Sequence, residues 1–333
     1  MIRIAVDAMS GDLGPRTAIS AVLQLAASAA SGVRFVLVGE RSSLERLLPD
    51  SLPPSLSVHH APSWVAMGDD PRSALRHGRQ TSMWQSLELV RTGQADACVS
   101  AGNTGALMAM GRYLLKSLPG IQRPAICKAM PVSRGRTYML DLGANVEATA
   151  EQLHQFALMG SVLASRELGR EAEVALLNVG TEALKGPELV RAANALILAD
   201  ERIRYLGYIE GDDIYSGRAD VVVCDGFTGN VALKASEGVA RLIGEKLREG
   251  VLSRGRHRLA MPLLRPLLKR WRKELDPGAY NGAIFLGLRR PVIKSHGSAD
   301  EAAFGRALEV AIEQVRRRIV EHIDSELRQD NQN

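Results

Sequence analysis

The chain has 333 residues, of which 46% are hydrophobic and 24% are charged, and its formal net charge is +5. This composition is ordinary for a globular protein with a sizeable core, and it excludes disorder over most of the length. No window of about 18 uninterrupted apolar residues and no apolar signal segment is present, so we expect a cytoplasmic protein. Three cysteines without a Cys-x-x-Cys pair (Cys98, Cys127 and Cys224) argue against a disulfide framework and a zinc site.

Short apolar runs alternate along the chain with segments of helical pattern. In chain order the runs are RIAV, RFVLV, DACVS, TYML, EVALLN, IRYL, DVVVC and PVIK. Such alternation predicts an α/β protein, with a mostly parallel sheet and helices on both faces in three layers. We expect residues 1–333 to form one unit, from which residues 236–275 project as a helical, basic and amphipathic segment.

Local signals predict where several helices begin. Pro15 suits the first turn of a helix, Thr149 with Gln152 forms a capping box, and Ser298 with Glu301 forms another.

Polar loops follow most of the predicted strands. They read MSGDLG, SAGNTG, DLGAN, NVGTEALKG, CDGFTGN and KSHGSAD. Ligands of open parallel sheets bind outside the carboxyl ends of the strands, and helix N-termini attract anions, so we expect the loops to converge on a phosphate. None of them is GxGxxG or GxxxxGK[ST], which argues against a nucleotide site. Tight turns alone would also explain glycine-rich loops.

Two of these loops resemble each other. Residues 95–108 read ADACVSAGNTGALM and residues 219–234 read ADVVVCDGFTGNVALK. Both have an Ala-Asp start, an apolar run, a loop of Gly, Asn and Thr, and a helical continuation. The similarity suggests that both junctions serve one site.

Longer motifs follow one another from near residue 5 to near residue 305. They are DAMSGDLGP, DDPRSALR with TSMWQSLELV, ADACVSAGNTGAL, GIQRPAI, LDLGANVEATAEQLHQFALMG, LLNVGTEALKGPEL, ADVVVCDGFTGNVALKASEG and IKSHGSAD. In this order they resemble the motifs of the PlsX-type phosphate acyltransferases of bacterial phospholipid synthesis. Two departures are Ser10, where the family usually has glycine, and NGAIFLGL after Tyr280, where the family is richer in glycine and proline.

The resemblance implies a fold related to phosphotransacetylase and to isocitrate and isopropylmalate dehydrogenases, a homodimer and loose membrane association. It also implies a reaction in which inorganic phosphate takes a fatty acyl group from acyl carrier protein, giving acyl phosphate and free carrier thiol. The resemblance further implies a membrane-bound glycerol-phosphate acyltransferase as a candidate partner. Two alternatives stay open, a phosphotransacetylase-like enzyme that uses coenzyme A and a non-catalytic membrane scaffold.

Phosphate is itself the nucleophile of this reaction, so the enzyme needs a cation for the dianion and neutral donors for the oxyanion. Lys185, before a predicted helix, is the candidate phosphate clamp, with a solvated surface lysine as the alternative. Asn230 and Asn103 are candidate oxyanion donors, or plain helix caps. Neighbouring loop residues are expected to bind substrate: Gly102, Thr104, Gly105, Thr228 and Gly229.

Three further residues complete the predicted site. His296 can bind phosphate or protonate the leaving thiolate, with loop packing as the alternative. Lys294 is a second candidate cation, because strand alternation places it on the same side as His296. Asp225 would repel a dianion, so we expect it to accept loop hydrogen bonds or to fix Lys185; an acid/base role stays open.

No cofactor, metal or acyl-cysteine intermediate is expected. Asp7, Asp12 and Asp141 are spaced in no metal-ligand pattern. Cys224 has no adjacent base and an aspartate beside it, so its thiol should have a raised pKa and react poorly.

Residues 254–273 hold eight Lys or Arg and no acid. Apolar side chains recur among them, with two prolines that interrupt a regular helix: Leu259, Leu263, Leu264, Leu267, Leu268 and Trp271. This pattern is typical of a segment that lies on a membrane surface. Acidic acyl carrier protein is an alternative partner, and a core or dimer helix is another. Nucleic acid is not expected, because no nucleic-acid-binding motif is present.

Overall fold

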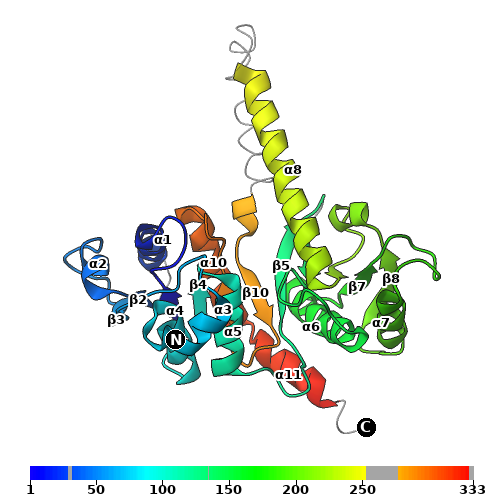
Figure 1. Ribbon diagram of the computed structural model, residues 1–333, viewed down its shortest axis with the longest axis horizontal. Helices are drawn as coiled ribbons and strands as arrows, with labels where there is room; N and C mark the ends of the chain where they lie inside the picture. The colour runs from blue at the N-terminus through cyan, green and yellow to red at the C-terminus, as the bar shows by residue number, and fades with distance from the viewer. Residues whose placement is uncertain (29–31, 134, 253–276, 330–333) are drawn as a thin grey trace.

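The computed structural model describes residues 1–28, 32–133, 135–252 and 277–329 (Figure 1). Its centre is an 11-stranded sheet of order β3-β2-β1-β4-β11-β10-β5-β6-β9-β7-β8. The strands are β1 (Ile2–Asp7), β2 (Val33–Gly39), β3 (Leu56–His60), β4 (Ala97–Ser100), β5 (Ala125–Pro131), β6 (Arg136–Leu140), β7 (Glu173–Leu177), β8 (Arg204–Ile209), β9 (Val221–Val223), β10 (Ala283–Leu286) and β11 (Val292–Lys294). All eight predicted runs are confirmed as strands, whereas β3, β5 and β10 were not predicted.

The two halves of the sheet run in opposite directions. Strands pair in parallel within each half, but the three central pairings, β11–β10, β10–β5 and β5–β6, are antiparallel. Seven of the ten pairings among the described residues are parallel, which confirms a mostly parallel sheet. The expectation that all the loops meet at one edge is wrong. Loops after β6, β7 and β9 leave the edge opposite to those after β1, β4 and β11, because the chain reverses through β10 and β5.

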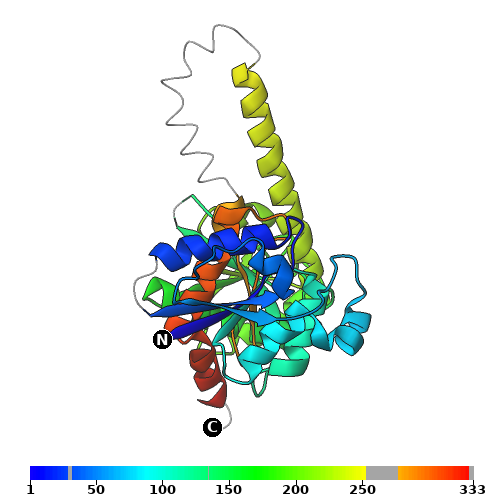
Figure 2. The same ribbon diagram turned by 90° about the vertical axis from the view of Figure 1, so that its left-hand side faces the viewer.

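Helices cover both faces of the sheet (Figures 1 and 2). They are α1 (Pro15–Ser28), α2 (Arg41–Glu45), α3 (Pro71–His77), α4 (Ser82–Arg91), α5 (Thr104–Leu115), α6 (Ala150–Leu168), α7 (Glu188–Leu198), α8 (Gly226–Leu252), α10 (Glu301–Arg316) and α11 (Ile319–Gln329), with short 3-10 turns η1 (Gly78–Gln80), η2 (Gly211–Tyr215) and η3 (Pro277–Tyr280). Leu107 of α5 and Leu233 of α8 pack on one apolar cluster, on the same face as Val222 of β9. Helices α1 and α10 cover one half of the other face, and α6, α7 and α11 cover the rest.

Two of the three predicted helix starts are confirmed. Helix α1 begins at Pro15, and the Thr149–Gln152 capping box opens α6. The second capping box is wrong, because Asp300 caps α10 by accepting a hydrogen bond from the Ala303 N–H group at 2.9 Å. Ser298 instead contacts His296, as described below.

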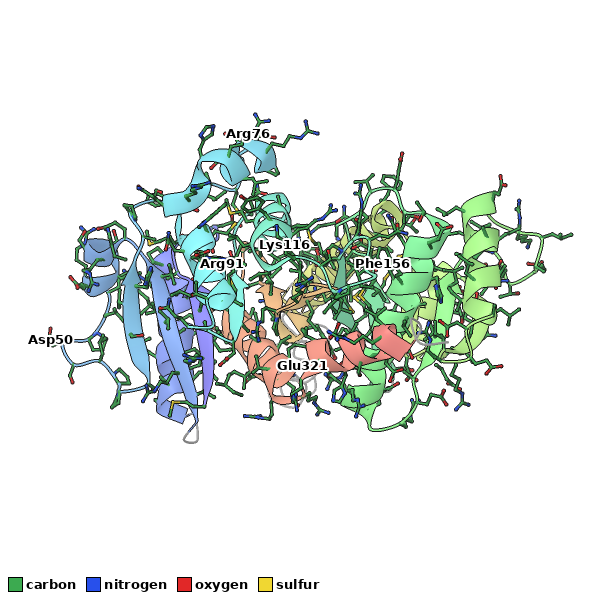
Figure 3. All side chains as sticks on the ribbon, turned by 90° about the horizontal axis from the view of Figure 1, so that it is seen from below. Asp50, Arg76, Arg91, Lys116, Phe156 and Glu321 are labelled. Atoms are coloured by element: carbon green, nitrogen blue, oxygen red, sulfur yellow. The ribbon has the colours of Figure 1, made fainter. Side chains whose placement is uncertain are left out.

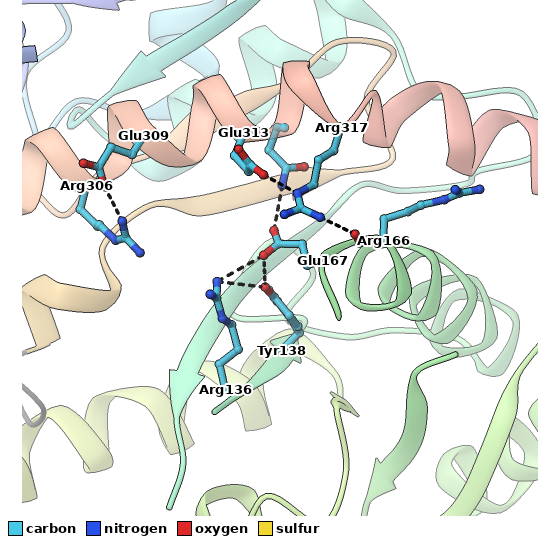
Figure 4. A network of polar contacts seen from close by, with 9 residues as sticks. Arg136, Tyr138, Arg166, Glu167, Arg306, Glu309, Glu313 and Arg317 are labelled. Carbon is cyan, nitrogen blue, oxygen red and sulfur yellow. Dashed lines mark hydrogen bonds and ion pairs between the residues drawn. The ribbon is translucent and has the colours of Figure 1, made fainter. Parts of the chain in front are cut away.

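A polar network joins α6 and α10 beside β6 (Figure 4). The Glu167 carboxylate accepts hydrogen bonds from Arg136 at 3.2 Å and from the Tyr138 hydroxyl at 2.5 Å. Gln314 of α10 reaches the other Glu167 oxygen at 3.5 Å. Each of these groups has a protein partner, so the network reads as structural support for the C-terminal half.

Helix α8 extends well beyond the two helix layers (Figures 1 and 2). Its distal part exposes three large apolar side chains, Val239, Leu242 and Ile243. The predicted membrane-contact residues between Leu259 and Trp271 lie outside the described residues. Within the described ranges, none of the helices has both the length and the hydropathy that a membrane span requires.

Candidate functional site

A buried carboxylate fixes the junction between β4 and α5. Asp7, at the end of β1, accepts a hydrogen bond from the Ser100 hydroxyl at 2.6 Å. Ser100 accepts in turn from the Gly102 N–H group at 3.1 Å, and Ser10 accepts from the Ala101 N–H group at 3.0 Å. Burial raises the pKa of Asp7, and the serine hydroxyls counteract part of that rise. The loop therefore enters α5 on a fixed path, to which Ser10 contributes a side-chain bond that glycine would lack.

Asn103 caps helix α5 with its whole amide. Its Oδ1 accepts from the Ala106 N–H group at 3.0 Å. Its Nδ2 donates to the carbonyls of Met67 at 2.9 Å and Asp69 at 3.0 Å. The cap that sequence analysis held as an alternative is confirmed. Both amide hydrogens are occupied, so Asn103 would have to release one of these carbonyls in order to donate to an oxyanion. That role stays a prediction.

The glycines of this loop have packing reasons of their own. A Cβ at Gly102 would lie 2.6 Å from Met83 Cε, and one at Gly105 would lie 2.7 Å from Pro71 Cγ. Thr104, the first residue of α5, is half-buried. Packing alone explains the two glycines, and the substrate contacts predicted for Gly102, Thr104 and Gly105 stay predictions.

Lys294 ends β11 beside the same loop. Its Nζ donates hydrogen bonds to the carbonyl of Ala101 at 3.0 Å and to that of Ser295. Burial lowers the pKa of Lys294 to about 8, although Asp12 and Asp7 favour the charged form. A partly desolvated ammonium group thus lies next to the N-terminus of α5.

Two further lysines, which sequence analysis missed, lie near Lys294. Lys128 of β5 is buried, and its Nζ is 3.6 Å from a carboxylate oxygen of Glu237 on α8. The other Glu237 oxygen is 3.1 Å from Lys234 Nζ. Burial lowers the pKa of Lys128, whereas the pKa of Lys294 is lowered by burial first and then by the like charge of Lys234. Lys128 and Lys234 therefore share one carboxylate, and Lys234 also repels the charge of Lys294.

His296 presents a neutral imidazole to these lysines. Its Nδ1 accepts from the Ser298 N–H group at 3.2 Å and lies 2.8 Å from the Ser298 hydroxyl, which leaves the ring proton on Nε2. Burial first, and then Lys234, lowers the pKa of His296. The backbone N–H group of His296 donates to Asn281 Oδ1 at 2.9 Å, which fixes the position of this residue. We call Lys128, Lys234, Lys294 and His296 the cationic cluster.

The junction between β9 and α8 lies at the opposite edge of the sheet. Asp225 accepts hydrogen bonds from the Thr228 N–H and hydroxyl groups, both at 2.8 Å, so the predicted loop bonding is confirmed. Gly229 allows α8 to pack closely, since a Cβ there would lie 1.9 Å from the Asp141 carbonyl oxygen.

Asn230 connects this junction to the cationic cluster. It is exposed, and its amide makes no hydrogen bond with the described residues. It precedes Lys234 by one helical turn, about 6 Å along α8, so both side chains project on the same side. The Asn230 amide is therefore free to donate to an oxyanion, the role predicted for it.

Lys185 lies apart from the cluster. In the sheet, four strands separate β7 from β11, which holds Lys294, and two strands separate β7 from β5, which holds Lys128. These separations are roughly 24 Å and 14 Å at the usual strand spacing. The Lys185 ammonium group is exposed and 2.8 Å from Glu182, whose hydrogen bond raises its pKa. Asp225 therefore does not fix Lys185. The phosphate-clamp role of Lys185 stays a prediction, to which phosphate binding at the cationic cluster is the alternative.

The described residues offer neither a reactive thiol nor a grouped set of metal ligands. Cys98, Cys127 and Cys224 are all free and buried. Burial, and then Asp225, raises the pKa of the Cys224 thiol well above its usual value. Within the described ranges, no three His, Cys, Asp or Glu side chains are grouped as a metal site requires.

Known proteins resemble this chain over nearly its whole length. A sequence profile described as "Fatty acid synthesis protein" matches residues 2–322. The protein named "Phosphate acyltransferase" in Cellvibrio japonicus is 53% identical over 327 residues, which is 97% of each chain.

Solved structures share the fold. A phosphotransacetylase from Streptococcus pyogenes covers 95% of this chain and 94% of its own, with a TM-score of 0.63 at 17% identity. An isocitrate dehydrogenase from Methylococcus capsulatus covers 96% and 88%, with a TM-score of 0.50 at 11% identity. The fold implied by the motif resemblance is confirmed. From the profile match and the near-full-length identity, the chain belongs to the fatty acid synthesis protein family, to which the PlsX-type phosphate acyltransferases belong.

Proposed function

We propose that this chain, an acyltransferase with inorganic phosphate as acceptor, takes a fatty acyl group from acyl carrier protein and releases acyl phosphate for phospholipid synthesis. The acceptor follows from relatives that are named phosphate acyltransferases. The cationic cluster is the observation that carries the proposal. Of its three lysines, only Lys128 and Lys234 pair with a carboxylate of the described residues, and they share the same one, Glu237, which leaves an excess of positive charge for a small dianion.

The chemistry follows from these positions. Lys294 and Lys234 hold phosphate, one of whose oxygens attacks the thioester carbonyl carbon. The Asn230 amide donates to the oxyanion of the tetrahedral intermediate. The carbon–sulfur bond then breaks, and the His296 Nε2–H group donates a hydrogen bond to the departing sulfur. The thiolate takes the proton that the attacking phosphate (HPO4²⁻) carried, which leaves acyl phosphate and free carrier thiol.

Transfer assays with a single acyl chain test the donor. Purified protein is incubated with palmitoyl-acyl carrier protein or palmitoyl-coenzyme A, with and without phosphate, and acyl phosphate is measured. We expect phosphate-dependent release of acyl phosphate from the carrier protein at the higher kcat/KM. Preference for coenzyme A would assign the chain to the phosphotransacetylase-like alternative. Absence of phosphate-dependent turnover with either donor would favour the scaffold alternative.

The exposed apolar side chains of α8 support a homodimer. Val239, Leu242 and Ile243 have no covering element in the described part of the chain, and a second copy of α8 would bury them. We expect a dimer in sedimentation equilibrium and a monomer for the Leu242→Glu, Ile243→Glu variant.

We also propose that the protein is cytoplasmic and that the residues between Leu259 and Trp271 contact the membrane surface. Acyl phosphate is labile, so a short path to a membrane-bound glycerol-phosphate acyltransferase would preserve it. Co-sedimentation with anionic but not neutral vesicles, weakened by salt, is the expected result. Leu263→Glu with Leu267→Glu should abolish this binding.

A further inference from the structure

We propose that helix α3 and the loop before it form the docking surface for the acidic acyl carrier protein. The inference rests on the proposed function, in which that protein carries the acyl donor. The surface consists of Arg72, Arg76, Arg79, Trp64 and Met67, and we call it the α3 surface.

The three arginines concentrate positive charge at one place. Arg72 and Arg76 are exposed and one helical turn apart, so they project on the same side of α3. Arg79 is exposed in η1, directly after α3. Figure 3 shows Arg76 at the outer side of the molecule. Neighbouring like charges destabilise a helix, so the arrangement favours a partner that supplies carboxylates.

The described part of the chain provides no carboxylate within ion-pair distance of these arginines. The nearest acids in sequence are committed to backbone groups, since Asp70 accepts from the Ser73 N–H group at 2.8 Å and Asp69 from the Ala66 N–H group at 2.8 Å.

Some arginines on other helices do have such partners. Arg91 pairs with Glu88 on α4, and Arg328 with Asp324 on α11. The arginines of α3 are thus available to an external acidic surface.

Apolar side chains next to the arginines suit a protein partner. Trp64 is 52% exposed and Met67 is 44% exposed. Tryptophan, methionine and arginine are enriched in protein interfaces, where a few such side chains provide most of the binding free energy. Charge complementarity selects an acidic partner, and the apolar pair gives it a contact that salt does not screen.

The α3 surface adjoins the cationic cluster. Asn103 donates to the Met67 carbonyl, and Pro71 packs against Gly105 at the start of α5. A Cβ at Gly297, the residue after His296, would lie 3.1 Å from Met67 Cε. A carrier protein docked on α3 would therefore present its thioester arm past Met67 to His296 and Lys294.

Charge reversal tests the surface. The Arg72→Glu, Arg76→Glu variant is compared with the Arg34→Glu, Arg290→Glu variant, which carries the same charge change at exposed arginines on β2 and before β11. Initial rates are measured with palmitoyl-acyl carrier protein at low and high salt, and with palmitoyl-pantetheine, which lacks the carrier protein. Urea unfolding midpoints check that both variants are folded.

We expect the α3 variant to raise the KM for palmitoyl-acyl carrier protein on the order of tenfold or more at low salt, and to weaken the salt dependence. Its rate with palmitoyl-pantetheine should match that of the control variant. An unchanged KM for the carrier protein, or an equal loss with both donors, would overturn the α3 surface alone. If the unaltered chain transfers no acyl group from the carrier protein, the donor assignment and the α3 surface are both wrong.

Discussion

The β4–α5 junction and the β9–α8 junction begin their helices with similar residues but use them differently. At the first junction the Asn103 side chain is the helix cap, and its amide hydrogens are bound to the carbonyls of Met67 and Asp69. At the second junction Asp225 is the cap, and Asn230, inside the first turns of α8, leaves its amide exposed. The polar side chain of the first junction is thus engaged in structural hydrogen bonds, whereas the second junction offers a free amide.

Position in the sheet separates the two junctions further. They lie at opposite edges, because the halves of the sheet are antiparallel. Helix α8 connects the two, because it runs over the sheet from Asn230 to Glu237, whose carboxylate lies 3.6 Å from Lys128 Nζ on β5. The site therefore combines a fixed loop beside Lys294 with the exposed side of one long helix.

The largest expected effect comes from reversing a charge on α8. Lys234→Glu should lower kcat/KM for phosphate by about a thousandfold, because it replaces a cation of the cluster with a second carboxylate beside Glu237. Lys246→Glu, farther along the same helix and exposed, is the matched control and should retain the activity. Steady-state kinetics in phosphate measure both. Equal activity of the two variants would remove α8 from the site.

Alanine at the two asparagines should separate rate from stability. Asn230→Ala should lower kcat by about a hundredfold and leave the free energy of unfolding unchanged, since it removes an oxyanion donor that has no structural bond. Asn103→Ala should lower the free energy of unfolding by about 1–2 kcal/mol through loss of the cap. Urea denaturation and single-turnover rates provide the two readouts. If both variants lose stability but not rate, the two junctions are equivalent caps.

The pH dependence should report Lys294. Its folded-state pKa of about 8 lies below the ordinary value of 10.5, so the ammonium form is lost as pH rises through 8. We expect kcat/KM for phosphate to fall above pH 8. Over the window from 8 to 10.5 the unfolded chain binds more protons, so this group makes stability rise with pH. Lys294→Arg should move the kinetic limb upward, since arginine stays protonated. A limb that does not move would assign it to another group.

Much of the fold could be predicted, because eight strands are apolar runs between polar loops. Strand β5 was missed because Lys128 interrupts its apolar pattern. Strand β10 lies in the NGAIFLGL stretch, which was interpreted only as a departure from the family motif. These two strands carry the antiparallel steps, so missing them led to the wrong convergence of loops.

Within the candidate site, His296 and Lys294 could be predicted, because they lie in the polar loop after an apolar run. Lys234 was within reach of the same reasoning, because it lies one helical turn from Asn230.

The smallest effect is expected at Cys224. Its thiol is buried, with Sγ 3.6 Å from the Asp141 carbonyl oxygen, and a serine hydroxyl can donate to the same carbonyl. Cys224→Ser should therefore retain most of the activity, measured as acyl phosphate release. A folded but inactive variant would revive an acyl-cysteine intermediate.

Phosphate binding at the cationic cluster can be tested most directly by comparing the phosphate KM of Lys294→Met with that of Lys185→Met. Both variants remove one ammonium group and keep a long side chain. We expect Lys294→Met to raise the phosphate KM on the order of a hundredfold. Lys185→Met should leave it near the unaltered value, because the ammonium group that this change removes is paired with Glu182. A raised KM in Lys185→Met together with an unaltered KM in Lys294→Met would instead place phosphate at the loop after β7.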